Sequence, residues 1–211
     1  MRKYVLVIVA LAWPAGADAQ IIRQRFPPGQ PSAWVSVGAA LQSSWSVRDG
    51  STGSTWDFGS STQYAASIEK SLSNGATVGI RGTTAMVPLV YTSGSLQTEA
   101  DANVSQAFAS LHIASGREFH SVLELSAGAT LYSNFRARGT GSKLAPDAPD
   151  ADFTFAFGYG FGYSFSPSFS MDVVQDISTV VHQKTGLSAS DDSSVRVNGT
   201  RIVARVGLGG R

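Results

Sequence analysis

The sequence contains no cysteine. This absence excludes a disulfide framework, a thiol nucleophile and any metal site built on cysteine. Long apolar runs are missing as well, because beyond residue 19 no run approaches the length of about 18 residues that a membrane-spanning helix needs. Any insertion into a bilayer must therefore use strands, since lipid offers no partners for open backbone groups.

An excess of charge of one sign is also absent. Removing Arg2, Lys3 and Asp18 with a leader segment from the 16 basic and 15 acidic residues leaves 14 of each, so the remaining chain is neutral. There is no basic face of the kind that binds nucleic acid, and no nucleic-acid partner is expected.

The N-terminus has the pattern of a secretory signal peptide, predicted over residues 1–19. A basic start is followed by the apolar run Tyr4–Trp13, which is too short for a spanning helix, and by Ala17-Asp18-Ala19, a small-residue cleavage pattern. An N-terminal membrane anchor is the alternative. The proline-containing segment 20–32 is predicted to be a linker and residues 33–211 a single barrel domain.

From Ala33 onward the dominant hydrophobic period is two, which is the period of a strand. The fold class predicted is all-β, a closed eight-stranded antiparallel transmembrane barrel. The eight predicted strands are Ala33–Gln42, Thr62–Leu72, Ala76–Met86, Ala102–Ala114, Phe119–Tyr132, Asp152–Phe165, Phe169–Val181 and Thr200–Gly210.

The predicted connections alternate strictly between short and long. The short ones are 73–75, 115–118 and 166–168, and the long ones are 43–61, 87–101, 133–151 and 182–199. Outer-membrane barrels show this asymmetry, with short periplasmic turns and longer outer loops. Because loops on a rigid scaffold often carry function, Trp45, Trp56 and Tyr91 are predicted as contact residues in the long loops.

Seven aromatic side chains share one face of the predicted strand Asp152–Phe165, and small residues share the other. These aromatics are Phe153, Phe155, Phe157, Tyr159, Phe161, Tyr163 and Phe165. Eight strands enclose an interior only just wide enough for side chains, so this face is predicted to point outward into lipid. A soluble, exported lipocalin-like barrel is an alternative that would require the aromatics to face inward.

The charged residues of the strands fall on the small, polar faces, which a closed barrel places in its lumen. The predicted lumen network consists of Glu69, Arg81, Glu124, Asp172, Asp176, Arg201 and Arg205. Asp172 and Asp176 are expected to pair with the two arginines of the last strand, because unpaired buried charge is costly. A three-residue turn at 166–168 would set Gly162 opposite Asp172 and Gly158 opposite Asp176. The barrel is therefore predicted to be filled and not an open pore.

With this pattern the chain resembles the small eight-stranded outer-membrane barrels of the OmpA/OmpX and opacity-protein type over residues 33–210. The resemblance implies insertion by the outer-membrane assembly machinery. The predicted location is the outer membrane of a Gram-negative bacterium, with outer-membrane lipid and lipopolysaccharide as partners and the chain as a monomer. The chain departs from these proteins at its C-terminus, which reads Leu208-Gly209-Gly210-Arg211 where they usually end in an aromatic residue.

Catalytic chemistry on the same barrel is the second alternative. Lipid A deacylases place a His and a Ser two positions apart on a lipid-facing strand, where both side chains share a face. Here His112, His120 and His182 are followed two positions later by Ala, Val and Lys, so no catalytic residue is predicted. The predicted function is a non-enzymatic envelope or surface-interaction role through the outer loops.

Two remaining polar features are interpreted as structural. His112 and Glu124 are predicted to form a polar contact in the lumen, whereas His182 is predicted to be solvated. The segment Asp147–Asp152 lacks the ligand spacing of a known calcium loop, so it is predicted to be a solvated loop. No metal site and no cofactor are predicted.

Overall fold

The chain forms a single antiparallel sheet of ten strands in a computed structural model that describes residues 30–50, 52–73, 75–146, 149–182 and 194–209. No helix within these residues is long and apolar enough to cross a membrane. The strands are β1 (Ala33–Gln42), β2 (Trp45–Asp49), β3 (Ser54–Phe58), β4 (Ser61–Ser73), β5 (Ala76–Ser93), β6 (Leu96–Gly116), β7 (Phe119–Ala137), β8 (Asp150–Ser166), β9 (Phe169–Val181) and β10 (Ser194–Leu208). The predicted signal peptide and nearly all of the predicted linker lie outside the described residues.

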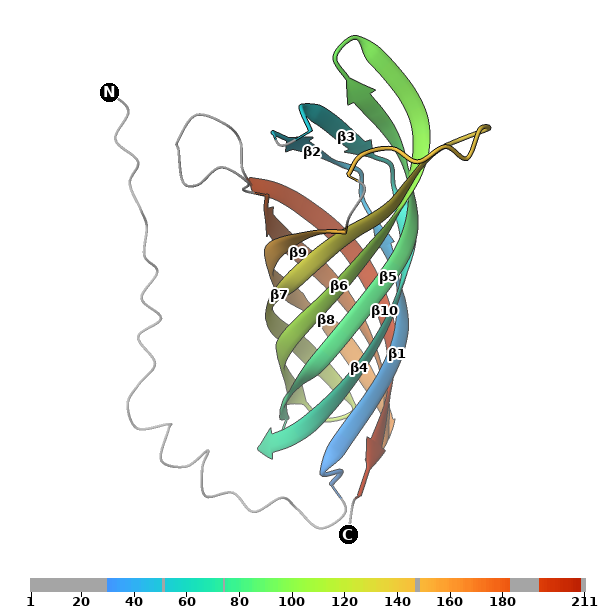
Figure 1. Ribbon diagram of the computed structural model, residues 1–211. Coiled ribbons are helices and arrows are strands. Elements are labelled where there is room, and N and C mark those ends of the chain that lie inside the picture. Colours follow the sequence, from blue (N-terminus) through green and yellow to red (C-terminus); the bar gives the residue numbers. More distant parts are fainter. Residues whose placement is uncertain (1–29, 51, 74, 147–148, 183–193, 210–211) are drawn as a thin grey trace, which may run out of the picture.

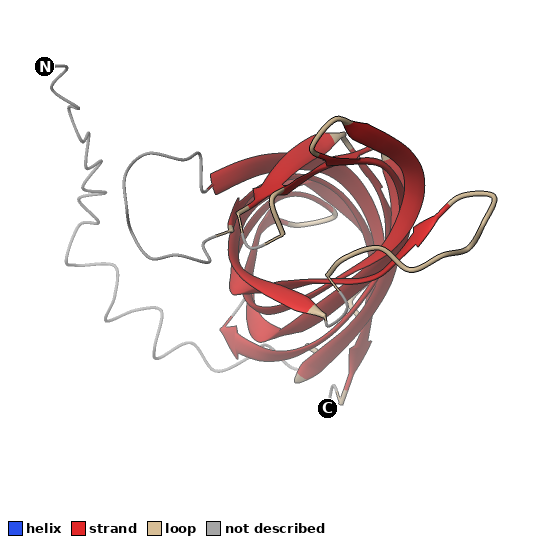
Figure 2. Ribbon diagram, turned by 45° about the horizontal axis from the view of Figure 1, so that its top comes forward, coloured by secondary structure: helices blue, strands red, loops and turns tan. Residues whose placement is uncertain are grey.

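Eight of these strands close into a barrel. Around the ring the order is β1, β4, β5, β6, β7, β8, β9 and β10, and β1 pairs with β10 to complete it. The closed ring is visible from above in Figure 2, and its tilted strands in Figure 1. The predicted fold class, a closed antiparallel barrel of eight strands, is confirmed.

The connections at one end are short, as predicted, but those at the other end differ from the prediction. Segment 87–101 is not a loop: β5 continues to Ser93 and β6 begins at Leu96, with a turn at Gly94, whose φ of 60° favours glycine. Segment 43–61 contains the hairpin of β2 and β3, and β3 pairs with β5. We call the resulting projection the outer extension, consisting of β2, β3, Met86–Ser93, Leu96–Val104 and Tyr132–Ala137.

The outer extension begins where the outward face of β6 changes character. Toward the short turns this face carries Ala107, Ala109, Leu111 and Ile113, whereas beyond Ser105 it carries Asn103, Asp101, Glu99 and Gln97. An apolar outward face suits lipid and a polar one suits water. The extension therefore projects beyond the apolar band of the barrel, as its position at the top of Figure 1 also shows.

Inside the outer extension the side chains are apolar and form an ordinary hydrophobic core. Trp56 is 0 % exposed, and Trp45 and Tyr91 are 7 % exposed, so the prediction that these three are loop contact residues is wrong. The reason is that alternation continues beyond the barrel, with the bulky residues now facing inward. The outer core consists of Trp45, Val47, Trp56, Phe58, Ala85, Val87, Leu89, Tyr91, Ala100, Ala102, Val104, Tyr132, Phe135, Val180 and Val197.

A bulge in β7 helps to build this core. Asn134 has a φ of 56°, a left-handed conformation that asparagine tolerates better than most residues. The pairing with β6 shifts at this point, from Asn103 opposite Ser133 to Asp101 opposite Arg136. The extra residue turns Phe135 inward, where it is 2 % exposed.

The seven aromatics of β8 lie on the outer surface, between 41 % and 59 % exposed. They are accompanied on neighbouring strands by exposed aliphatic residues such as Ile68, Ile80 and Leu125. This arrangement contradicts the lipocalin-like alternative, which needs the β8 aromatics inside. An apolar belt of this extent is unfavourable in water and matches a hydrocarbon surrounding.

Candidate functional site in the barrel lumen

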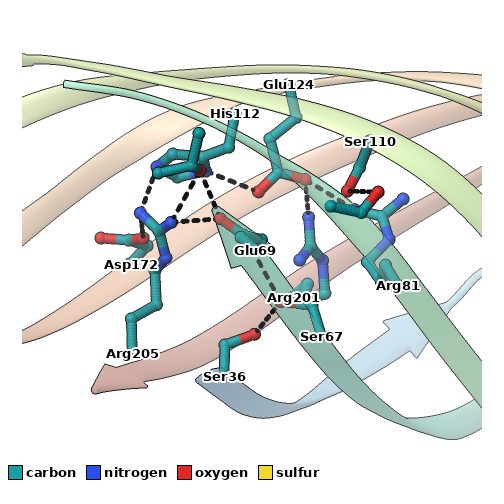
Figure 3. A network of polar contacts seen from close by, with 12 residues as sticks. Ser36, Ser67, Glu69, Arg81, Ser110, His112, Glu124, Asp172, Arg201 and Arg205 are labelled. Atoms are coloured by element: carbon teal, nitrogen blue, oxygen red, sulfur yellow. Dashed lines mark hydrogen bonds and ion pairs between the residues drawn. The ribbon is translucent and has the colours of Figure 1, made fainter. Parts of the chain in front are cut away.

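The polar faces of the strands meet in an ionic network inside the barrel, which Figure 3 shows from close by. All seven charged residues predicted for the lumen belong to it. They come from β4, β5, β7, β9 and β10, joined by His112 of β6 and His120 of β7. We call this set the lumen network: Glu69, Arg81, His112, His120, Glu124, Asp172, Asp176, Arg201 and Arg205.

Arg205 organises the half of the network nearer the short turns. Its guanidinium forms an ion pair with Glu69 and donates a hydrogen bond to Thr77 Oγ1 at 3.2 Å. A second nitrogen donates to His112 Nε2 and lies 3.9 Å from Asp172 Oδ2. The planar fork of arginine can serve several partners at once, which lysine cannot.

The contacts of His112 define its tautomer. Arginine can only donate, so Nε2 accepts from Arg205. Nδ1 must then carry the proton and donates it to Glu124 Oε1 at 3.0 Å. The imidazole is therefore a neutral bridge between the two halves of the network, consistent with the predicted His112–Glu124 contact.

Glu124 is the centre of the other half. It accepts hydrogen bonds from Arg81 at 2.6 Å and from Arg201 at 2.5 Å. Arg201 also donates to Asp176 Oδ2 at 2.9 Å, and Arg81 lies 3.8 Å from Asp176 Oδ1. Each of these charges is opposed by at least one of opposite sign, which offsets the large cost of removing it from water.

Strand β8 contributes space to the network instead of charge. The pairing of β8 with β9 sets Gly158 opposite Asp176 and Gly162 opposite Asp172, the register that a tight turn at 166–168 predicts. A methyl group at Gly162 would overlap both Asp172 and His120. Gly158 and Gly162 thus leave room for the carboxylates that they face, whereas a side chain at Gly160 would meet the backbone of Val173.

Toward the outer end the network gives way to neutral polar groups and then to the outer core. Gln106 Nε2 donates to Thr130 Oγ1 at 3.1 Å, which lies 2.7 Å from Thr154 Oγ1. A cavity of about 30 Å³ remains beside Gln42, Gln63 and Arg201, which is room for roughly two water molecules. The described part of the lumen is otherwise occupied by ion pairs below and apolar side chains above.

A second polar cluster was not predicted. It consists of Asp49, Asp150, Asp152 and His182, which are between 0 % and 8 % exposed, and we call it the outer cluster. The predictions that His182 is solvated and that Asp150 and Asp152 belong to a solvated loop are wrong. The period of two in Asp150, Asp152 and Thr154 could have placed both carboxylates on the inner face of β8. Asp147 of the same predicted loop lies outside the described residues.

Comparison with known proteins identifies the architecture. No protein-family model matches the sequence, and no curated protein matches it either. Among solved structures, Neisserial surface protein A matches with a TM-score of 0.56 and 12 % identity, covering 84 % of this chain and 97 % of that protein. OprG from Pseudomonas aeruginosa matches with a TM-score of 0.48 and 16 % identity, over 85 % of this chain and 95 % of its own.

The chain has the fold of a small outer-membrane β-barrel. The resemblance seen in the sequence is thereby confirmed at the level of architecture. Ail from Yersinia pestis matches with a TM-score of 0.43 and 14 % identity, over 84 % of this chain and 98 % of its own. Such small barrels share a wall of eight strands, and identities this low carry the fold and not the function.

Proposed function

We propose that this protein is a closed, non-enzymatic barrel of the outer membrane that presents its outer extension to partners at the cell surface. The observation that carries the proposal is the filling of the lumen. The lumen network occupies one end and the outer core occupies the other, so passage of solutes is not supported. What remains for interaction is the outward face of the extension, where β6 carries the polar residues Gln97, Glu99, Asp101 and Asn103.

The positions of the histidines weigh against the enzymatic alternative. His112, His120 and His182 are all buried, at 2 %, 5 % and 6 % exposure, and all point into the protein. A lipid hydrolase of the deacylase type needs its histidine on the face that meets lipid, where the substrate lies. The imidazoles of this chain are instead engaged by carboxylates of the interior.

Location and orientation can be tested with single cysteines, because the chain has none of its own. Ser95 lies at the exposed tip between β5 and β6, and Ser168 lies at an exposed short turn at the opposite end. A membrane-impermeant maleimide should label Ser95→Cys in intact Gram-negative cells, and Ser168→Cys only after the outer membrane is opened. Equal labelling of both in intact cells would contradict the proposed orientation.

The closed lumen is tested separately in planar lipid bilayers. The purified protein should show no steady ion conductance, because solute must cross both the ion pairs and the outer core. An engineered porin reconstituted in the same way serves as the positive control. Stable, stepwise conductance from the wild-type chain would favour transport over a surface role.

A further inference from the structure

The outer cluster brings three carboxylates and one imidazole together away from the lumen network. Asp49 ends β2, Asp150 and Asp152 begin β8, and His182 follows β9. The side chains of His182 and Asp152 are both 3 % exposed, and that of Asp150 is 9 % exposed. Asp49 is far from the other three residues in sequence, so the folding of the β2–β3 hairpin over the barrel brings the cluster together.

Both ring nitrogens of His182 face carboxylates. Nδ1 lies 2.7 Å from Asp152 Oδ2, within hydrogen-bond distance. Nε2 points toward Asp49 Oδ1 at 3.7 Å and has no hydrogen-bond partner among the described residues. A neutral imidazole carries a single N–H. With that N–H on Nε2 and directed toward Asp49, the lone pair of Nδ1 faces Asp152 and Asp150.

The distances fit a metal ion. One ligand atom each from Asp150, Asp152 and His182 lies within 4.8 Å of the other two. From His182 Nδ1 the oxygens are 2.7 Å away in Asp152 and 3.9 Å away in Asp150. Tetrahedral ligands at about 2.0–2.1 Å from a zinc ion are roughly 3.3 Å apart. The observed separations bracket that value, so small side-chain movements would close the site.

We propose that the outer cluster binds a divalent transition-metal ion of the zinc class, with His182 Nδ1, Asp150 and Asp152 as ligands. In the bound state the lone pair of Nδ1 is donated to the metal ion, and the single proton of the neutral imidazole resides on Nε2. That proton is then donated to Asp49, the carboxylate–histidine–metal arrangement that orients many histidine ligands. An imidazole ligand favours zinc-like ions over calcium and magnesium, which prefer oxygen alone.

The proposed metal site is separate from the proposed surface role, because the ion would stabilise the outer end of the barrel. It would connect the start of β8 with the end of β9, and through Asp49 it would also hold the β2–β3 hairpin. Trp56 of this hairpin packs against the ring of His182, with centroids 5.5 Å apart. An ion at this position would link the outer core to the barrel wall.

The experiment measures zinc binding by the folded, tag-free protein in detergent micelles after chelator treatment. Calorimetry should give one Zn²⁺ per chain, and X-ray absorption should show nitrogen and oxygen ligands including imidazole. Replacing a ligand in His182→Gln or Asp152→Asn should weaken binding by about a hundredfold or more, and Asp49→Asn by about 10–100-fold. Asp101→Asn, which removes an outward carboxylate of the extension, is the matched control and should bind as the wild type does.

Heat-dependent gel migration verifies that each variant is folded before its affinity is compared. The proposal is overturned if folded His182→Gln binds zinc as tightly as the wild type, or if the wild-type protein binds none. It is also overturned if nitrogen NMR finds both ring nitrogens of His182 protonated in the presence of saturating zinc. That last result would mean that Nδ1 carries a proton and therefore does not bind the metal ion.

Discussion

At the scale of single residues, the lumen network depends on glycines, which leave space for the charged side chains, as well as on those charged side chains themselves. Gly162 faces Asp172 across the β8–β9 pair, and His120 Nε2 lies 2.9 Å from Asp172 Oδ1. Asp172 is 1 % exposed, so water cannot replace a lost partner. A glycine at this position is therefore a requirement of the charge network and not a sign of flexibility.

Substituting Gly162→Ala should destabilise the barrel. The added methyl group would displace Asp172 or His120, and a buried hydrogen bond to a charged group that is lost costs about 1–3 kcal/mol. The free energy of unfolding, measured with urea in lipid vesicles, should fall by this amount. Gly82→Ala is the control, because the nearest atom to its methyl group is Gln106 O at 3.9 Å. Equal stability of the two variants would contradict the steric argument.

A second residue-scale prediction concerns Asp101 and Arg138 of the outer end. Arg138 donates to both carboxylate oxygens of Asp101, with its Nη2 2.6 Å from Oδ1, and these hydrogen bonds lower the pKa of Asp101 below its usual value. A lowered folded-state pKa adds stability above the unfolded pKa of about 3.9. That stability is lost as the pH falls through the folded value. Because both side chains are accessible to solvent, screening by water and salt keeps this gain small.

The measurement is a carbon NMR titration of the Asp101 carboxyl. Its midpoint should lie below that of a model peptide in the wild type and return toward it in Arg138→Gln. A midpoint that does not move when Arg138 is replaced would show that the ion pair is not formed in solution.

At the scale of elements, the β2–β3 hairpin acts as the lid of the outer core. Trp56 is its central residue, with ring centroids 4.7 Å from Phe135 and 5.6 Å from Tyr132. Its indole Nε1 donates to Ser54 Oγ at 2.8 Å, so its one polar atom is satisfied. The hairpin is attached to the barrel through β5 and through the packing of this side chain.

Substituting Trp56→Ala should lower the free energy of unfolding by about 3–5 kcal/mol, the usual cost of removing a fully buried large aromatic side chain. The loss should be confined to the outer end, so limited proteolysis in lipid vesicles should cut the outer extension and leave the rest of the barrel intact. Gln97→Ala, an exposed position of the same extension, should change neither measurement. A protease-resistant Trp56→Ala protein would mean that β-pairing alone holds the hairpin.

The sequence allows the barrel to be predicted more completely than its outer end, and the reason is physical. Within the lipid band the bulky residues face outward and the small ones inward. The alternation of residues and their size therefore predict the same outward face for each strand. In the outer extension the alternation persists but the apolar face turns inward, as the burial of Val87, Leu89 and Tyr91 shows. Nothing local in β5 marks the point at which lipid is replaced by water.

The outer cluster escaped prediction for a related reason. His182 follows β9 and Asp49 ends β2, and their proximity depends on where the hairpin folds over the barrel mouth. Only the alternation of Asp150 and Asp152 is local. The ion pairs of the lumen were easier to predict, because β9 and β10 are neighbours along the chain. Their register places Asp172 and Asp176 near the arginines of β10.

At the scale of the whole molecule, one half of the barrel is polar inside and apolar outside, whereas the other half encloses an apolar core and has a polar outward face on β6. The described tryptophans all belong to the interior: Trp34 lies under the guanidinium of Arg205, 5.1 Å from its ring centroid, and Trp45 and Trp56 lie in the outer core. The lipid-facing aromatics are phenylalanine and tyrosine. Tryptophan fluorescence therefore reports on the inside of this protein.

This arrangement predicts how brominated lipids, which quench tryptophan on contact, will act on residues 20–211 folded into vesicles. Wild-type emission should change little, because Trp34, Trp45 and Trp56 are separated from the acyl chains by the barrel wall. Phe157→Trp should add emission that bromine in mid-chain quenches strongly. Phe165→Trp, near the short turns, should be quenched more by bromine close to the headgroups. Strong quenching of the wild-type protein, or none of Phe157→Trp, would mean that the strands face the other way.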